Sequence, residues 1–162
     1  MKNMKKVHYD KVLILPNIRS AINVGSIFRT ADGVGVDKIY LVGYTPRPID
    51  RFGRAQKDIA KSALGAETWI PWEYREDLVE LIKTLKDDDY SIIALEQDKN
   101  AIDYRKLKPT KKMAFIVGPE VNGLDKIILK LCDSIVEIPM YGKKESLNVS
   151  VATGIALFRI LN

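Results

Sequence analysis

Residues 12–42 read VLILPNIRSAINVGSIFRTADGVGVDKIYLV, in which two apolar runs flank a segment with helical spacing. The runs at 12–15 and 38–42 predict strands, and Pro16 stops the first of them. Between them, residues 22–31 place four apolar side chains on one stripe of a helix, namely Val24, Ile27, Phe28 and Ala31. The stretch therefore predicts a strand, a helix and a second strand in succession.

The same alternation continues along the rest of the chain. Further strands are predicted at 91–95, 113–117 and 135–138, a short extended run at 68–70, and helices at 73–86, 124–131 and 147–161. Apolar strands separated by helices indicate an α/β fold, with a mostly parallel sheet and helices on both faces. Ligands bind such sheets outside the carboxyl ends of the strands. Three loops rich in Gly, Asn, Ser and Pro follow such ends, at residues 16–26, 118–124 and 139–150.

Length and composition limit the kind of protein. The chain has 162 residues, 46% of them apolar and 29% charged, and no linker or repeat divides it, so we expect one domain over residues 1–162. The single cysteine, Cys132, excludes an internal disulfide framework, and with the single histidine, His8, it cannot make a Cys/His zinc site. The acidic residues also lack metal-ligand spacing, so no metal is expected. The glycine patterns of dinucleotide-binding and phosphate-binding loops are incomplete or missing.

Positive charge is concentrated toward the N-terminus. Residues 1–61 hold 12 Lys and Arg against 5 Asp and Glu, whereas residues 62–162 hold 14 against 16. A one-sided basic region indicates a polyanionic partner, nucleic acid before membrane, although such charge can also serve only to keep a protein in solution. Apolar runs are too short for a membrane span, and the N-terminal segment MKNMKKVHYD lacks the apolar core of a signal peptide. A cytoplasmic location is therefore expected.

Three segments carry a recognisable combination of motifs. They read PNIRSAINVGSIFRTADGVG at residues 16–35, FIVGPEVNGL at 115–124 and IPMYGKKESLNVSVATGIAL at 138–157. In this order and spacing they resemble the signature motifs of the SpoU branch of the SPOUT superfamily, also called the TrmH family, and the resemblance spans nearly the whole chain. Members of this family are RNA ribose 2′-O-methyltransferases that use S-adenosylmethionine (AdoMet).

The resemblance implies a SPOUT fold, in which the C-terminal segment threads through a loop and forms a deep trefoil knot that holds the cofactor. Composition does not suggest such a knot, since knots are nearly absent from proteins. The resemblance also implies a homodimer with helices beside the knot at its interface. The predicted helix at 147–161 is apolar on almost all sides, which suits burial against a partner as well as full burial within one subunit.

Positions in the second and third motifs are assigned to the cofactor by the same resemblance. The residues whose backbone would contact AdoMet are Gly118, Ile138 and Leu147, and Leu95 matches the residue that closes the adenosine pocket. From the residues alone, Gly118 and Gly123 bracket a turn directly after a buried strand. Glycine there permits a close approach between backbone and ligand, or simply a turn into the next helix.

Arg29 and Asn23 match the main catalytic residue of the family and its companion. They lie six residues apart on the first predicted helix, which makes them neighbours without sharing a stripe. The alternative role for Arg29 is a surface ion pair with Asp32, three residues further on. Because guanidinium holds its proton strongly, a bidentate clamp on an RNA phosphate is a more conservative role for Arg29 than general base.

Three further residues match the catalytic pocket of the family. Ser146 and Asn148 match polar residues that line it, and Glu120 matches the glutamate of the second motif. Ser146 is alternatively the N-cap of the final helix. Asn148 is harder to explain as a cap, because the predicted helix has already begun before it. The alternative for Glu120 is a solvated side chain in a turn.

Basic residues after the proline-containing loop are candidates for an RNA-binding surface. A helix there would place four of them on one stripe, at spacings of three, three and four: Arg51, Arg54, Lys57 and Lys61. Arg47, Arg19 and Lys11 lie in the same basic third of the chain. The alternative is a solvated helix face whose charge Asp50 and Asp58 moderate.

Two other functions are compatible with parts of the sequence. An RNA-binding module without catalytic activity accounts for the basic third but leaves the third motif without a role. A SPOUT enzyme that methylates a base is disfavoured by the first motif, with its Asn23 and Arg29. Family members that act on rRNA often carry an extra N-terminal RNA-binding domain. Because we expect no separate RNA-binding extension here, the resemblance favours tRNA over rRNA.

Overall fold

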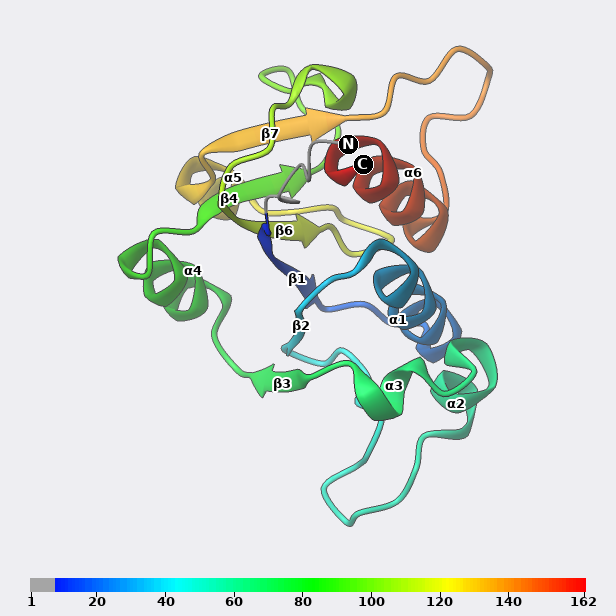
Figure 1. Ribbon diagram of the computed structural model, residues 1–162. Coiled ribbons are helices and arrows are strands. Elements are labelled where there is room, and N and C mark those ends of the chain that lie inside the picture. Colours follow the sequence, from blue (N-terminus) through cyan, green and yellow to red (C-terminus); the bar gives the residue numbers. More distant parts are fainter. Residues whose placement is uncertain (1–7) are drawn as a thin grey trace, which may run out of the picture.

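The computed structural model describes residues 8–162, which form one parallel sheet of seven strands in the order β3-β2-β1-β6-β4-β7-β5 (Figure 1). The strands are β1 (Asp10–Pro16), β2 (Lys38–Val42), β3 (Trp72–Arg75), β4 (Ser91–Leu95), β5 (Ile102–Asp103), β6 (Lys112–Val117) and β7 (Ser134–Glu137). The helices are α1 (Ala21–Val34), α2 (Lys57–Ala63), α3 (Ala66–Trp69), α4 (Leu78–Asp87), α5 (Lys126–Leu131) and α6 (Val149–Leu161), and a 3-10 turn, η1, spans Tyr104–Lys106. The prediction that the N-terminal segment MKNMKKVHYD is not a signal peptide concerns residues that lie outside the described ones, apart from the last three.

Helices cover both faces of the sheet, as the apolar strands predicted (Figure 1). Successive residues of β1 point to opposite faces, because side chains alternate along a strand. Leu13 and Leu15 pack with α1, α2, α3 and α6, whereas Val12 and Ile14 pack with α4 and α5. All four side chains are buried. The predicted α/β class and the parallel sheet are confirmed.

The region after β2 differs from the prediction. Residues 68–70 were expected to be extended, but α3 occupies most of this run, and the strand follows it at Trp72–Arg75. The helix expected from residue 73 begins only at Leu78, where the Asp77 side chain accepts a hydrogen bond from the Glu80 amide and caps it. Strand β3 is an edge strand that pairs with β2 alone. An edge strand tolerates polar residues, and this one therefore lacks the apolar run that predicted the others.

The last two helices begin two residues later than expected. Helix α6 starts at Val149, and its N-cap is Asn148, whose Oδ1 accepts hydrogen bonds from the amides of Ser150 and Val151. Ser146, the predicted cap, lies in the preceding loop. The expectation that Asn148 is already inside the helix is therefore wrong. Helix α5 likewise starts at Lys126 instead of Leu124.

The strand order brings the three motif loops together. Strands β1, β6, β4 and β7 are consecutive neighbours, so the loops after their carboxyl ends meet at one edge of the sheet. The loop between β7 and α6 makes a long excursion there, drawn in orange in Figure 1. This strand order is consistent with the knotted fold implied by the resemblance. Within residues 8–162, the helices are all too short or too polar to cross a membrane.

Candidate functional site

A pocket of about 450 Å³ lies at the carboxyl ends of β4, β6 and β7. Its wall contains the four residues predicted to contact the cofactor: Leu95, Gly118, Ile138 and Leu147. They come from the ends of three strands and from the residue before the cap of α6. The structure therefore brings these positions together around one cavity, while their contact with a cofactor stays a prediction.

The turn after β6 closes around an acidic side chain that the sequence analysis missed, Glu96. Its Oε2 accepts a hydrogen bond from the Leu124 amide at 2.9 Å, and its Oε1 accepts one from the Gln97 amide at 3.0 Å. A Cβ atom at Gly118 would lie 2.5 Å from Oε2, and one at Gly123, where φ is +65°, would lie 2.7 Å from it. A side chain at either position would therefore displace the Glu96 carboxylate, and the positive φ of Gly123 favours glycine there in addition. The signal that could have found Glu96 is its place directly after Leu95, at the end of a buried strand.

Three predicted catalytic residues, one from each motif, form a hydrogen-bonded chain. Asn23 on α1 donates from Nδ2 to Oε1 of Glu120 at 3.2 Å. Asn148 donates from Nδ2 to Oδ1 of the same Asn23, also at 3.2 Å. Glu120 and Asn148 both line the pocket, and Asn23 joins them from the side. The chain places two amide groups and one carboxylate at the rim of the cavity.

Glu120 also fixes the start of α1. Its carboxylate accepts hydrogen bonds from the backbone amides of Arg19 at 3.0 Å and Ser20 at 3.4 Å. Partial burial opposes ionisation of this carboxyl, but the Arg19 amide and the Asn23 side chain outweigh it, so the pKa of Glu120 lies below its ordinary value. The residue is therefore ionised at neutral pH and acts as a hydrogen-bond acceptor, in contrast to the merely solvated turn glutamate that was the alternative.

Ser146 lines the pocket, but Arg29 does not. Arg29 is exposed on α1, and six residues of helix carry it about 9 Å along the axis from Asn23. The alternative ion pair with Asp32 is also not formed between these described residues. Asp32 instead accepts a hydrogen bond from the Trp69 indole at 2.7 Å. A catalytic role for Arg29 stays a prediction.

The predicted helical stripe of basic residues is wrong in its first half. Helix α2 begins only at Lys57, because the Asp50 carboxylate accepts hydrogen bonds from the Phe52 and Arg54 amides and holds the chain in a turn. The turn nevertheless gathers basic residues around an open groove of about 780 Å³, which is lined by Arg47, Arg51, Arg54 and Lys57. Lys61 lies one turn further along α2, outside this groove. Arg19 lines a separate hollow of about 270 Å³ between the groove and the pocket.

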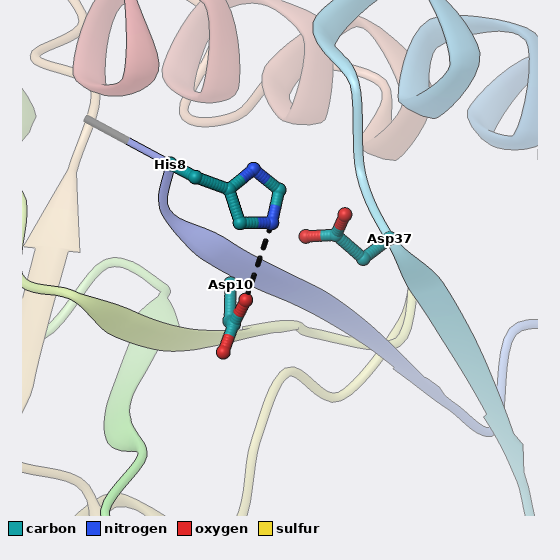
Figure 2. Close-up of side chains that lie close together, drawn as sticks. All are labelled: His8, Asp10 and Asp37. Carbon is teal, nitrogen blue, oxygen red and sulfur yellow. Dashed lines mark ion pairs between the residues drawn. The ribbon is translucent and has the colours of Figure 1, made fainter. Parts of the chain in front are cut away.

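One group of potential metal ligands occurs in residues 8–162, and it lies far from the pocket. His8, Asp10 and Asp37 place one ligand atom each within 4.8 Å of one another (Figure 2). They stand at the beginnings of β1 and β2, opposite the carboxyl ends. His8 and Asp10 form an ion pair at 3.3 Å, and Asp37 accepts a hydrogen bond from the Lys11 amide. These contacts hold the three side chains together at the end of the sheet opposite the pocket.

Comparison with known proteins identifies relatives along nearly the full chain. The model of the SpoU rRNA Methylase family matches residues 10–158. A protein of Staphylococcus epidermidis named as a TrmH family tRNA/rRNA methyltransferase is 33% identical over 159 residues, which are 98% of this chain and 61% of that protein. The chain thus spans about three fifths of the length of the curated relatives it matches.

Solved structures have the same fold. The AdoMet-bound rRNA methyltransferase from Sinorhizobium meliloti has a TM-score of 0.84 at 27% identity, covering 93% of this chain and 55% of that one. The A. aeolicus TrmH/SpoU tRNA modifying enzyme has a TM-score of 0.81 at 28% identity, covering 96% of this chain and 76% of that one. The architecture described above is therefore shared with SpoU methyltransferases.

Proposed function

Because this chain belongs to the SpoU rRNA methylase family, we propose that it transfers a methyl group from AdoMet to a ribose 2′-hydroxyl of an RNA. The observation that carries the proposal is the hydrogen-bonded chain of Asn23, Glu120 and Asn148 at the rim of the 450 Å³ pocket. It unites one polar residue from each of the three motifs. We favour tRNA over rRNA as the substrate, as the resemblance in the sequence predicts; the A. aeolicus tRNA modifying enzyme and the S. meliloti rRNA methyltransferase share the fold equally.

The pocket has the size and chemistry expected for AdoMet. Its volume lies in the usual range for small-molecule sites of about 300 to 1,000 Å³. Apolar side chains line it, among them Leu95, Val117, Ile138 and Leu147, and the loops around it offer backbone polar groups that can read an adenine. We assign Leu95, Gly118, Ile138 and Leu147 to holding the cofactor. When bound, AdoMet supplies a methyl group already activated by the sulfonium charge.

The residues of this chain then have to position the ribose and its phosphate. The carboxylate of Glu120 holds the Asn23 amide in place, and the Asn23 carbonyl in turn holds the Asn148 amide. Ser146 adds a hydroxyl group to the same wall, and its oxygen or an oxygen of the RNA phosphate takes the proton that leaves the 2′-hydroxyl as the methyl group moves from sulfur to oxygen. Because a guanidinium group is too weak a base to take up a proton, the role of Arg29 in the proposal is to clamp an RNA phosphate.

Two measurements test the proposal. Calorimetry with AdoMet is expected to show binding, and transfer of labelled methyl to tRNA followed by nuclease digestion and mass spectrometry is expected to yield a 2′-O-methylated nucleotide. Absence of AdoMet binding would instead support an RNA-binding module, and a methyl group on the base would support a base methyltransferase. Methyl transfer is expected to need no metal ion. A requirement of the reaction for magnesium, with an RNA that is already folded, would contradict this expectation.

The catalytic assignment is tested on Arg29. Arg29→Ala is expected to abolish methyl transfer and leave AdoMet affinity nearly unchanged, because the residue is exposed outside the pocket. Arg29→Lys is expected to restore only part of the activity, since an ammonium group cannot make a bidentate clamp. Near-normal turnover by Arg29→Ala would remove Arg29 from the catalytic set.

The proposal includes a homodimer. Four apolar side chains are exposed on the two helices that pack together beside the pocket: Ile22 on α1, and Val151, Ile155 and Phe158 on α6. The opposite side of α6 buries Ala156, Leu157 and Ile160 in the core. A helix with apolar residues on both its buried and its exposed side supports a second copy of the chain as the covering partner.

A further inference from the structure

An aromatic ring is held in solvent at the tip of the loop between β2 and α2. Phe52 is 67% exposed. The turn that carries it is well ordered: Asp50 accepts hydrogen bonds from the amides of Phe52 at 2.8 Å and Arg54 at 2.9 Å, and Ile49 and Ala55 form an antiparallel bridge at its base. Gly53 supplies the left-handed conformation, with φ of +76°. The turn therefore holds the ring of Phe52 in a fixed position in solvent.

Positive charge surrounds this ring. The guanidinium carbons of Arg51 and Arg54 lie 4.9 and 5.0 Å from the Phe52 ring centroid. Arg47 lies 4.3 Å from the ring of Tyr74 on the neighbouring strand β3. All three arginines line the same 780 Å³ groove as Phe52. The groove therefore combines ring faces with cations, a combination that fits the bases and phosphates of a nucleic acid strand.

The groove is connected to the pocket by shared residues. Tyr44, which is 59% exposed, lines both the groove and the 270 Å³ hollow beside it. Glu120 and Val121 line both that hollow and the 450 Å³ pocket. The Tyr44 amide donates to Oδ1 of Asn17, so the start of the loop is tied to the first motif. A continuous track thus runs from Phe52, past Tyr44, to the polar chain at the pocket.

We propose that Phe52 is a stacking site for an unpaired base, and that the RNA strand follows this track so that the methylated nucleotide lies in a single-stranded segment. The inference rests on the proposed function and names the class of RNA that the site takes. The exposed ring can stack only on a base that is not already stacked within a duplex. A duplex presents its sugar–phosphate backbone to the protein instead. The stacked base takes the place of the Arg51 guanidinium, which then pairs with the adjacent phosphate, because Nε of Arg54 is already held by Asp50 at 2.8 Å.

Binding of two RNA probes tests the proposal. Fluorescence anisotropy compares a short unpaired oligoribonucleotide with an RNA duplex of the same sequence, using wild type, Phe52→Ala, Phe52→Leu and Phe52→Trp. Wild type and Phe52→Trp are expected to prefer the unpaired probe. Phe52→Ala and Phe52→Leu are expected to bind the unpaired probe about 5- to 100-fold more weakly, with unchanged affinity for the duplex. Ile127→Ala is the control, since Ile127 is 69% exposed on α5, on the opposite face of the sheet.

The same variants separate this inference from the proposed function. AdoMet binding measured by calorimetry is expected to be equal in all of them, because Phe52 lies outside the pocket. Equal losses for both probes, or none for either, would overturn the stacking site even if methyl transfer to RNA is found. Selective loss of unpaired RNA in a protein that binds no AdoMet would support the stacking site and overturn the proposed methyl transfer.

Discussion

At the scale of single residues, Asn148 joins the fold to the site. Its Oδ1 caps α6, and its Nδ2 donates to Asn23. Asn148→Asp is expected to keep the cap and change the free energy of unfolding by less than about 0.5 kcal/mol, whereas Asn148→Ala is expected to lose about 1 kcal/mol. Both variants lose the donor to Asn23, so methyl transfer is expected to fall in both. Urea unfolding and activity assays measure the two effects, and full activity in Asn148→Asp would restrict Asn148 to capping.

Cys132 gives a pH-dependent test of the fold at the same scale. Burial raises the pKa of its thiol to about 11, so at pH 8 only about one molecule in a thousand carries a thiolate. Modification by a thiol reagent is therefore expected to be slow at pH 8 and to rise about tenfold per pH unit up to pH 10. In denaturant the pKa returns to about 8.5 and the reaction is expected to be fast. Fast modification of the folded protein at pH 8 would contradict the raised pKa of this partly buried thiol.

At the scale of secondary-structure elements, the close packing of α1 on α2 depends on Gly25. A Cβ atom there would lie 2.5 Å from the carbonyl oxygen of Ile59 and would also overlap the Ser62 hydroxyl. Gly25→Ala is expected to destabilise the protein by about 1 to 3 kcal/mol, since the two backbones must separate. Gly154 on α6 is the matched control, because its added Cβ would lie 3.5 Å from Thr30, an ordinary contact.

Gly154→Ala is accordingly expected to stabilise the protein by about 0.5 to 1 kcal/mol, the usual gain for alanine over glycine inside a helix. Chemical denaturation of both variants measures the difference. If Gly25→Ala is as stable as Gly154→Ala, α2 can move away from α1 at little cost. The loop that carries Phe52 is then less firmly anchored than its contacts indicate.

At the scale of the whole molecule, we propose that the exposed apolar side chains of α1 and α6 form the interface of a dimer. The chain of 18.3 kDa is expected to sediment as a dimer at micromolar concentration. Ile155→Glu introduces a charge in this patch and is expected to yield a folded monomer, whereas Ile127→Glu on the other face is expected to leave the dimer intact. Circular dichroism checks that both variants fold. A wild-type monomer would contradict the proposed interface.

The α/β class of the fold and the place of the candidate site could be predicted from the sequence alone. Buried strands such as β1 and β6 are apolar at every central position, and this pattern predicted a parallel sheet covered on both faces. The same pattern located the three motif loops at the carboxyl ends of strands. Edge strand β3 was missed because it has one neighbour and keeps polar residues, so local composition does not reveal its burial.

Which polar groups meet depends on how the folded chain brings distant segments together. Asn23 and Glu120 are 97 residues apart in the chain, and Asn23 and Asn148 are 125 apart, yet hydrogen bonds join them. Glu96 fills the space above Gly118 and Gly123, and Asp50 turns the chain where a helical stripe was expected. The reason is physical. Periodicity reports how much of each segment is buried, whereas hydrogen bonds between loops depend on strand order and on atomic distances that only the folded chain sets.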